Sequence, residues 1–205
     1  MGVPSHRCRV AAPAFPQTLS AEFDLANFET FLTMTPQEFQ AIYPHVIGWI
    51  RQTLAACANQ AETVASQGFP RLPLYFNPEL LASTKFVRVE RVPVPPLSQL
   101  GLTRFAAFEQ GNYDGITYLD TFFVTRHRAN DEGLSFHELI HVVQWQLLGP
   151  ERFLAVYAAG LESCGYRNSP LEVMAYNAEA DFRQSVKPFN AEILVAEQLR
   201  LMPAT

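Results

Sequence analysis

The stretch His137-Glu138-Leu139-Ile140-His141 constrains the fold of this chain more strongly than any other part of its sequence. On an α-helix, residues four positions apart lie on one face, so both imidazoles can point a nitrogen at one ion about 2.0–2.1 Å away. The carboxylate of Glu138 then lies beside the ion, where it can take a proton from a metal-bound water. The pattern therefore predicts a helix that carries two zinc ligands and a general base.

The predicted helix begins near residue 131 and ends near residue 148. Asn130-Asp131 offers an N-cap, and Gly149-Pro150 offers a stop. A capping box between Ser135 and Glu138 would instead start the helix at Ser135 and engage Glu138 with backbone N–H groups. We favour the earlier start, because it accommodates both end signals. Apolar residues on nearly every side predict that this helix is buried; they are Leu134, Phe136, Leu139, Ile140, Val142, Val143, Trp145, Leu147 and Leu148.

A catalytic zinc site needs a third protein ligand and leaves the fourth position for water. Two candidates lie on a downstream helix that Pro170 can open: Glu172 and Glu179 are seven residues apart, on nearly the same helical face. Spacing alone does not choose between them, and Asp181 is a weaker candidate because it lies off that face. A capping box between Ser169 and Glu172 is the competing structural interpretation of Glu172.

The segments HELIHVVQW and SPLEVMAY together resemble the gluzincin branch of the zincin metallopeptidases. More narrowly, they resemble a group of little-characterised bacterial metallopeptidase domains with HExxHVVQ and a later PxEvxAy segment. The resemblance covers roughly residues 115–183. It implies that His137, His141 and Glu172 bind zinc and that Glu138 is the general base.

One position departs from the thermolysin pattern. That pattern has an acidic residue four positions after the ligand Glu, and this chain has Tyr176 there. The acid normally orients a ligand imidazole, so the resemblance does not identify the group that does so in this chain.

The strand before the active-site helix commonly forms the edge of the sheet in zincins, and an extended substrate pairs with it. By that resemblance, residues 116–123 would line a peptide groove, with Ile116, Tyr118 and Phe122 as substrate-binding residues. An ordinary sheet strand without a ligand is the alternative that the sequence leaves open.

A transition-state oxyanion also needs a hydrogen-bond donor opposite the base. Tyr157, Tyr166 and His127 are candidates for this catalytic role, and spacing fixes none of them. A tyrosine is more often a core residue whose hydroxyl is satisfied within the protein.

Composition predicts one ordinary soluble domain over residues 1–205. Of its residues, 48% are hydrophobic and 17% are charged, which is typical of a globular chain. The net charge of −5 leaves no electrostatic footprint for nucleic acid, and no apolar run is long enough to span a membrane. Cys8, Cys57 and Cys164 lie far apart, and the N-terminus lacks an apolar signal core. We therefore expect free thiols and a cytoplasmic location.

The domain divides by pattern into a Pro-rich tail (1–16), an N-terminal helical part (17–70) and a sheet with the metal-binding helices (71–205). The helical part has a short amphipathic stretch at 20–31. A long helix is predicted from Pro36 to about Ser66, with a kink or break at Pro44. Its lone His45 is interpreted as structural.

Strands are predicted where short segments rich in Val, Phe and Tyr are bounded by Pro or Gly: Leu72–Phe76, Lys85–Val94, Phe105–Glu109 and Ile116–Val124. After the HELIH helix, the pattern predicts helices at about 150–159, 169–186 and 190–201. Strands first and helices afterwards predict an α+β fold. By the resemblance it would be zincin-like, with a small mixed or antiparallel sheet before the active-site helix.

Two classes of function fit the sequence. The first is a zinc-dependent metallopeptidase that hydrolyses peptide bonds through a metal-activated water, with a peptide or protein as substrate. The second is a non-catalytic module that keeps the fold for binding a partner. The intact Glu138 favours the first, because a retired site has no chemical need for a base. Zinc-dependent hydrolysis of a non-peptide amide is a further alternative.

Overall fold

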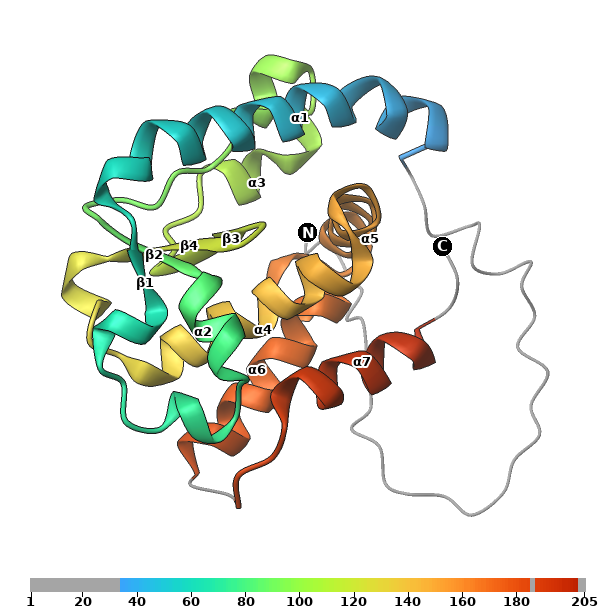
Figure 1. Cartoon of the computed structure of the whole chain (residues 1–205). Helices are drawn as coiled ribbons and strands as arrows, with labels where there is room; N and C mark the ends of the chain where they lie inside the picture. Colours follow the sequence, from blue (N-terminus) through green and yellow to red (C-terminus); the bar gives the residue numbers. More distant parts are fainter. Residues whose placement is uncertain (1–33, 185–186, 203–205) are drawn as a thin grey trace, which may run out of the picture.

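A small mixed sheet with α-helices on both sides organises the chain, so the α+β prediction is confirmed (Figure 1). The computed structural model describes residues 34–184 and 187–202. The predicted tail at 1–16 and the amphipathic stretch at 20–31 lie outside these residues. The elements, apart from short 3-10 turns, are α1 Pro36–Cys57, β1 Glu62–Thr63, α2 Pro78–Ser83, β2 Lys85–Val89, α3 Ala106–Glu109, β3 Gly115–Tyr118, β4 Thr121–Thr125, α4 Glu132–Leu148, α5 Pro150–Cys164, α6 Pro170–Arg183 and α7 Ala191–Leu201.

The four strands lie in the order β1-β2-β4-β3. β2 and β4 are parallel, with Lys85 opposite Thr121, while the outer pairs β1–β2 and β4–β3 are antiparallel. β3 is therefore an edge strand, and β4 is an inner strand whose residues are all buried. Figure 1 shows α1 and α3 on one side of the sheet and α2 and α4 on the other.

All four strand predictions need correction. Leu72–Leu74 forms a 3-10 turn, and Ala106–Glu109 is a short helix. The predicted strand Ile116–Val124 is instead the hairpin β3–β4, whose two-residue turn places Leu119 at φ 57°. Gly or Asn usually occupies this left-handed conformation, and a leucine rarely adopts it. The sequence therefore carries no residue that marks the turn. The predicted strand from Lys85 exists but ends at Val89.

Helix α1 begins as predicted and ends earlier than predicted. Thr35 and Glu38 form a capping box at its start. The helix continues through Pro44 without a break and ends at Cys57, after which the chain forms a 3-10 turn and the short strand β1. The predicted end near Ser66 is therefore wrong, because Glu62–Thr63 pairs with β2 and Val64–Gln67 forms a further 3-10 turn.

Helix α4 is the buried centre of the molecule. It packs against β3 and β4 on one side and against α6 and α7 on the other. Aromatic rings surround its N-terminal half: the ring centroids of Phe136 and Phe182 are 4.5 Å apart, and Tyr75 and Phe189 pack on the same cluster. Residues 135–145 are buried on every side of the helix, which holds this part of α4 rigid, whereas Leu147 is exposed, contrary to its predicted burial.

Helices α5 and α6 approach each other closely where α6 begins. A Cβ on Gly160 of α5 would lie 2.8 Å from the Cβ of Ser169 and 2.9 Å from the Cδ of Pro170. Only a glycine allows this approach without a shift of the chain. The contact brings the first turn of α6, which carries Glu172, beside Tyr157 of α5.

Candidate metal centre

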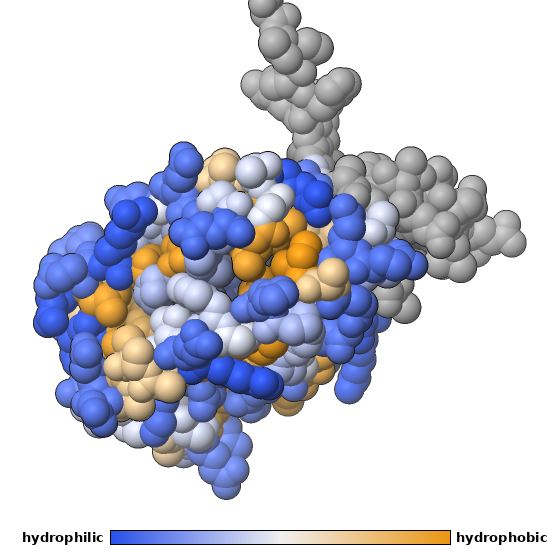
Figure 2. Space-filling view, turned by 90° about the horizontal axis from the view of Figure 1, so that it is seen from above, coloured by the Kyte–Doolittle hydropathy of each residue, from blue (hydrophilic) through white to orange (hydrophobic). Residues whose placement is uncertain are grey.

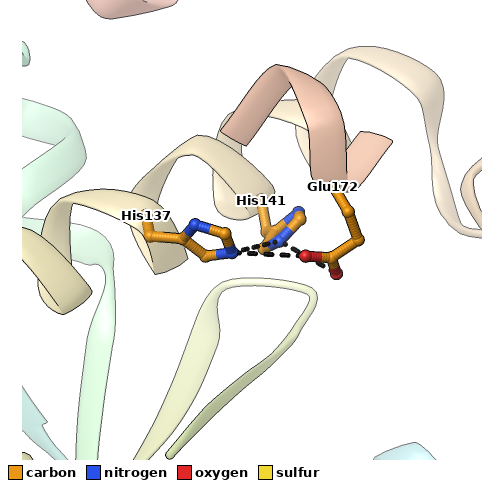
Figure 3. Close-up of side chains that lie close together, drawn as sticks. All are labelled: His137, His141 and Glu172. Carbon is orange, nitrogen blue, oxygen red and sulfur yellow. Dashed lines mark hydrogen bonds and ion pairs between the residues drawn. The ribbon is translucent and has the colours of Figure 1, made fainter. Parts of the chain in front are cut away.

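The two histidines of α4 and one glutamate of α6 converge on one point (Figure 3). The Nε2 atoms of His137 and His141 are 3.1 Å apart. Glu172 places Oε2 3.4 Å from the Nε2 of His137 and Oε1 3.4 Å from the Nε2 of His141. Helix α4 starts at Glu132, with Asp131 as its N-cap, and the four-residue spacing puts both histidines on one face.

These separations fit the spacing of ligands around a tetrahedral ion. Donors about 2.0–2.1 Å from one ion, at tetrahedral angles, are about 3.4 Å from one another. Two imidazole nitrogens and a carboxylate oxygen are also ligand types that zinc accepts. His137, His141 and Glu172 could therefore hold a zinc ion with little rearrangement.

Glu172 is a buried carboxylate with one oxygen left without a hydrogen bond. Its side chain is 2% exposed, and Oε2 has no hydrogen-bond partner within the described residues. The hydroxyl of Tyr157 donates to Oε1 over 2.7 Å. Ser169 makes no side-chain cap to α6, so the capping-box interpretation of Glu172 does not hold. A buried oxygen without a donor is expensive, and a cation would satisfy it.

Glu179 contacts the opposite side of His137. Its Oε2 lies 3.1 Å from the Nδ1 of His137, and its Oε1 accepts from the Nε of Arg183 over 2.7 Å. The ring of Tyr176 packs on His137 with centroids 4.6 Å apart. Glu179 therefore orients the imidazole of His137, whose other side faces Glu172. The weaker candidate Asp181 is exposed.

Gln144 orients the second histidine, His141. Gln144 was not predicted from the sequence. Its Oε1 lies 2.8 Å from the Nδ1 of His141, and its amide nitrogen donates to the carbonyl of Leu171 over 3.0 Å. Gln144 is fully buried. Its spacing, three residues after His141 on the same helix, is the signal that could have found it.

Glu138 is held by the edge strand. The hydroxyl of Thr117 donates to Oε2 of Glu138 over 2.6 Å. Oε1 lies so close to Gly115 that a Cβ on that glycine would be 2.2 Å from it. The capping-box interpretation of Glu138 with Ser135 is therefore wrong, because Asp131 caps the helix and Glu138 points at β3.

Burial and neighbouring charges shift the pKa values of Glu138, His137 and Glu172. Burial raises the pKa of Glu138 above its usual value, and the nearby His137 and His141 offset this only in part. Burial alone would lower the pKa of His137, but Glu172 and Glu179 raise it to about 10. For Glu172, the effect of burial is outweighed by His141 and His137, which hold its pKa far below the usual range.

A deep pocket opens from this cluster and reaches several of the predicted site residues. Ile116 and Tyr118 on β3 line it, as do Tyr157 and Tyr166, whereas Tyr113 lines it without having been predicted. The hydroxyl of Tyr118 is already engaged with the carbonyl of Pro93 over 2.7 Å.

Two predicted residues lie elsewhere. Phe122 is fully buried on the inner strand β4, where its ring packs edge-on against Phe86, so its proposed contact with substrate is wrong. Sequence spacing could not separate the edge strand from the inner strand of one hairpin. His127 is 72% exposed and pairs with Asp114 over 3.1 Å, so it does not contribute a donor to the pocket.

Comparison with protein-family models, curated proteins and solved structures finds no match for this chain. Among the residues that the structure describes, no helix is both long and apolar enough to cross a membrane.

Proposed function

We propose that this chain is a zinc-dependent metallopeptidase with a gluzincin-like site. The observation that carries the proposal is the arrangement of His137, His141 and Glu172, whose donor atoms lie 3.1–3.4 Å apart at a buried point. Glu138 beside them supplies the base that hydrolysis needs. A zincin-like fold, with the edge strand and the active-site helix side by side, is part of the same proposal.

A zinc ion at this site would polarise a scissile carbonyl and lower the pKa of water. Glu138 accepts the proton of the attacking water at Oε1, because Thr117 engages Oε2. Burial raises the pKa of Glu138, which brings its proton affinity closer to that needed near neutral pH. Glu138 then hands this proton to the leaving amine.

Tyr166 is the best candidate for the oxyanion donor. It lines the pocket together with Glu172, and burial raises its pKa well above the usual value, so its hydroxyl stays protonated. This hydroxyl is hydrogen-bonded to Tyr176 and would turn from it to donate to an oxyanion. Tyr157 is less suited, because its hydroxyl already donates to Glu172.

The edge strand favours a peptide as the substrate. Within the described residues, β3 pairs with β4 along one side only. On the other side the carbonyl of Thr117 accepts from the Nε1 of Trp145 over 3.1 Å, so an extended peptide would hydrogen-bond to the remaining backbone groups of β3, next to Glu138. A non-peptide amide would not need this strand.

Elemental analysis of protein purified without added metal tests the zinc site. We expect about one zinc per chain in the wild type, and none above background in Glu172→Ala. Glu179→Gln is the matched control, because Glu179 contacts the same histidine, His137, on the side away from Glu172. It should keep zinc with an affinity about 10–100-fold lower. Zinc loss in Glu179→Gln with retention in Glu172→Ala would exchange the two roles.

Cleavage of a diverse peptide library tests the chemistry. Wild-type cleavage should be abolished by a chelator, and Glu138→Gln should retain zinc while losing at least 10²–10⁴-fold in rate. Equal cleavage by both proteins would indicate a contaminant. Zinc-loaded wild type that cleaves no peptide would argue against a peptidase and for the binding module.

A further inference from the structure

The pocket that opens from the metal centre continues far beyond the reacting groups. It begins at Glu138, His141 and Glu172, and it extends between α1, α5 and the segment 95–108, with a cavity volume of about 110 Å³. One ordered water needs about 10–15 Å³ of such space, so the pocket has room for a large organic group. Figure 2 views the face that carries α1, where hydrophobic surface emerges between hydrophilic side chains.

The lining of this pocket is almost entirely apolar. Helix α1 contributes Phe39, Ile42 and Val46, and α5 contributes Leu154 and Leu161. Within the described residues, no Lys, Arg or Asp lines the pocket, and its carboxylates are Glu138 and Glu172 of the site itself. Away from these two carboxylates, a charged group would lose its hydration in this pocket without gaining a partner of opposite sign.

The lining also lacks a means of holding a chain terminus. Enzymes that bind a free carboxylate need a cation or a set of donors to replace its water, most often an arginine. The described lining offers no such cation. A substrate recognised by its terminal carboxylate therefore does not fit.

We propose that the substrate carries a bulky, uncharged, apolar group next to the scissile amide, and that this group fills the pocket. The inference rests on the proposed function, and it specifies the substrate class of that site. Two sources share the required chemistry: an N-acyl chain of several carbons, or a large aliphatic or aromatic side chain of a peptide.

Ala158 of α5 is the position that tests the pocket most directly. It lines the cavity, it is half-buried, and it is the smallest side chain of α5 there. Ala158→Trp should fill the pocket without touching the metal centre. Ala155→Trp is the matched control, because Ala155 is also half-buried on α5 and lies outside the lining.

Calorimetric titration of the metal-free protein measures ligand affinity in the pocket independently of catalysis. The probes are N-acetyl-, N-hexanoyl- and N-octanoyl-glycinamide, with N-(8-aminooctanoyl)-glycinamide as the charged equivalent. Each buried methylene should tighten binding about fourfold, so the octanoyl probe, with two more methylenes, should bind roughly 15-fold better than the hexanoyl probe. The charged probe and the Ala158→Trp variant should each lose at least tenfold, while Ala155→Trp binds as the wild type.

Affinity that does not depend on chain length, or equal binding of the charged probe, would overturn the proposal. If Ala158→Trp fails to fold by circular dichroism, Ala158→Leu serves in its place and should weaken the octanoyl probe several-fold. The same chain-length dependence, in a protein that elemental analysis shows cannot be loaded with zinc, would support the pocket and reject the peptidase. With zinc loaded, the relative cleavage of N-octanoyl-Gly-Gly amide and of acetyl peptides with Phe or Leu distinguishes the two sources.

Discussion

At the scale of single residues, the edge strand and the motif helix meet at the carboxylate of Glu138. Gly115 leaves the space that Oε1 occupies, and Thr117 donates to Oε2. A side chain at Gly115 would collide with Glu138, so the glycine is required by a close approach and not by its backbone conformation. Thr117 therefore has the position of a residue that aims the base.

Thr117→Val should slow hydrolysis and leave the metal in place. Loss of a hydrogen bond to a charged group costs about 1.5–3 kcal/mol, so we expect kcat to fall roughly 10- to 100-fold with a small change in KM. Zinc content should equal that of the wild type. Steady-state kinetics and elemental analysis measure both.

Thr121→Val is the control. It removes a hydroxyl of a buried residue on the same hairpin, and this hydroxyl bonds Asp120 and not Glu138. Its kcat should stay within about twofold of the wild type, since a hydroxyl that does not touch the reacting groups contributes only to stability. An unchanged kcat in Thr117→Val would contradict the positioning role.

At the scale of elements, charged groups tie the start of α4 to the end of α6. The carboxylate of Asp131 caps α4 through the N–H groups of Gly133 and Leu134, and it pairs with Arg128 and Arg183. A Cβ on Gly133 would lie 2.3 Å from the guanidinium carbon of Arg183, so that glycine lets the arginine cross the first turn. Arg183 also donates to Glu179, which orients His137, so the helix start and the metal centre share one ionic network.

Asp131→Asn should destabilise the fold in a pH-dependent way. Burial alone would raise the pKa of Asp131, but Arg183 and Arg128 lower it to about 2 from its ordinary 3.8. Because the folded pKa is the lower one, this stabilisation is present above about pH 4 and is lost as the pH falls towards 2. Asparagine keeps the cap and removes the charge, so we expect about 1 kcal/mol of destabilisation at pH 7.

Urea unfolding of both proteins between pH 2 and pH 7 measures this effect. The difference between wild type and variant should shrink below about pH 4. A difference that stays constant across this range would show that the carboxylate of Asp131 does not stabilise the fold through its charge.

At the scale of the whole molecule, the candidate metal centre draws its residues from two helices that are distant in sequence. α4 supplies two donors and α6 supplies the third, at the buried interface between the two helices. A ligand that binds only the folded state raises the free energy of unfolding. Zinc bound between α4 and α6 should therefore stabilise the folded state.

Thermal unfolding followed by circular dichroism tests this effect. Free zinc at 100 times its Kd should stabilise the protein by about 2.7 kcal/mol, which raises Tm by roughly 5–10 °C in a domain of this size. Glu172→Ala should show no such shift. An equal shift in Glu172→Ala would place the stabilising zinc elsewhere in the protein.

The sequence by itself determined the local features of the site. The span of α4, its cap at Asp131 and the shared face of His137 and His141 follow from periodicity and capping, which act within one or two turns. The starts of α1 and α7 were predicted for the same reason. Short aromatic segments such as Leu72–Phe76 were misassigned, because burial in a turn leaves the same composition as burial in a strand.

Only the tertiary structure decided how distant groups meet. Glu172 and Glu179 share a helical face, so the sequence does not distinguish them. The packing of α6 on α4 places Glu172 at the donor cluster and Glu179 behind His137. The hairpin turn at Leu119 separates the edge strand from Phe122, and the apolar pocket forms between elements more than a hundred residues apart. Such distances depend on the whole packed core, and no local pattern encodes them.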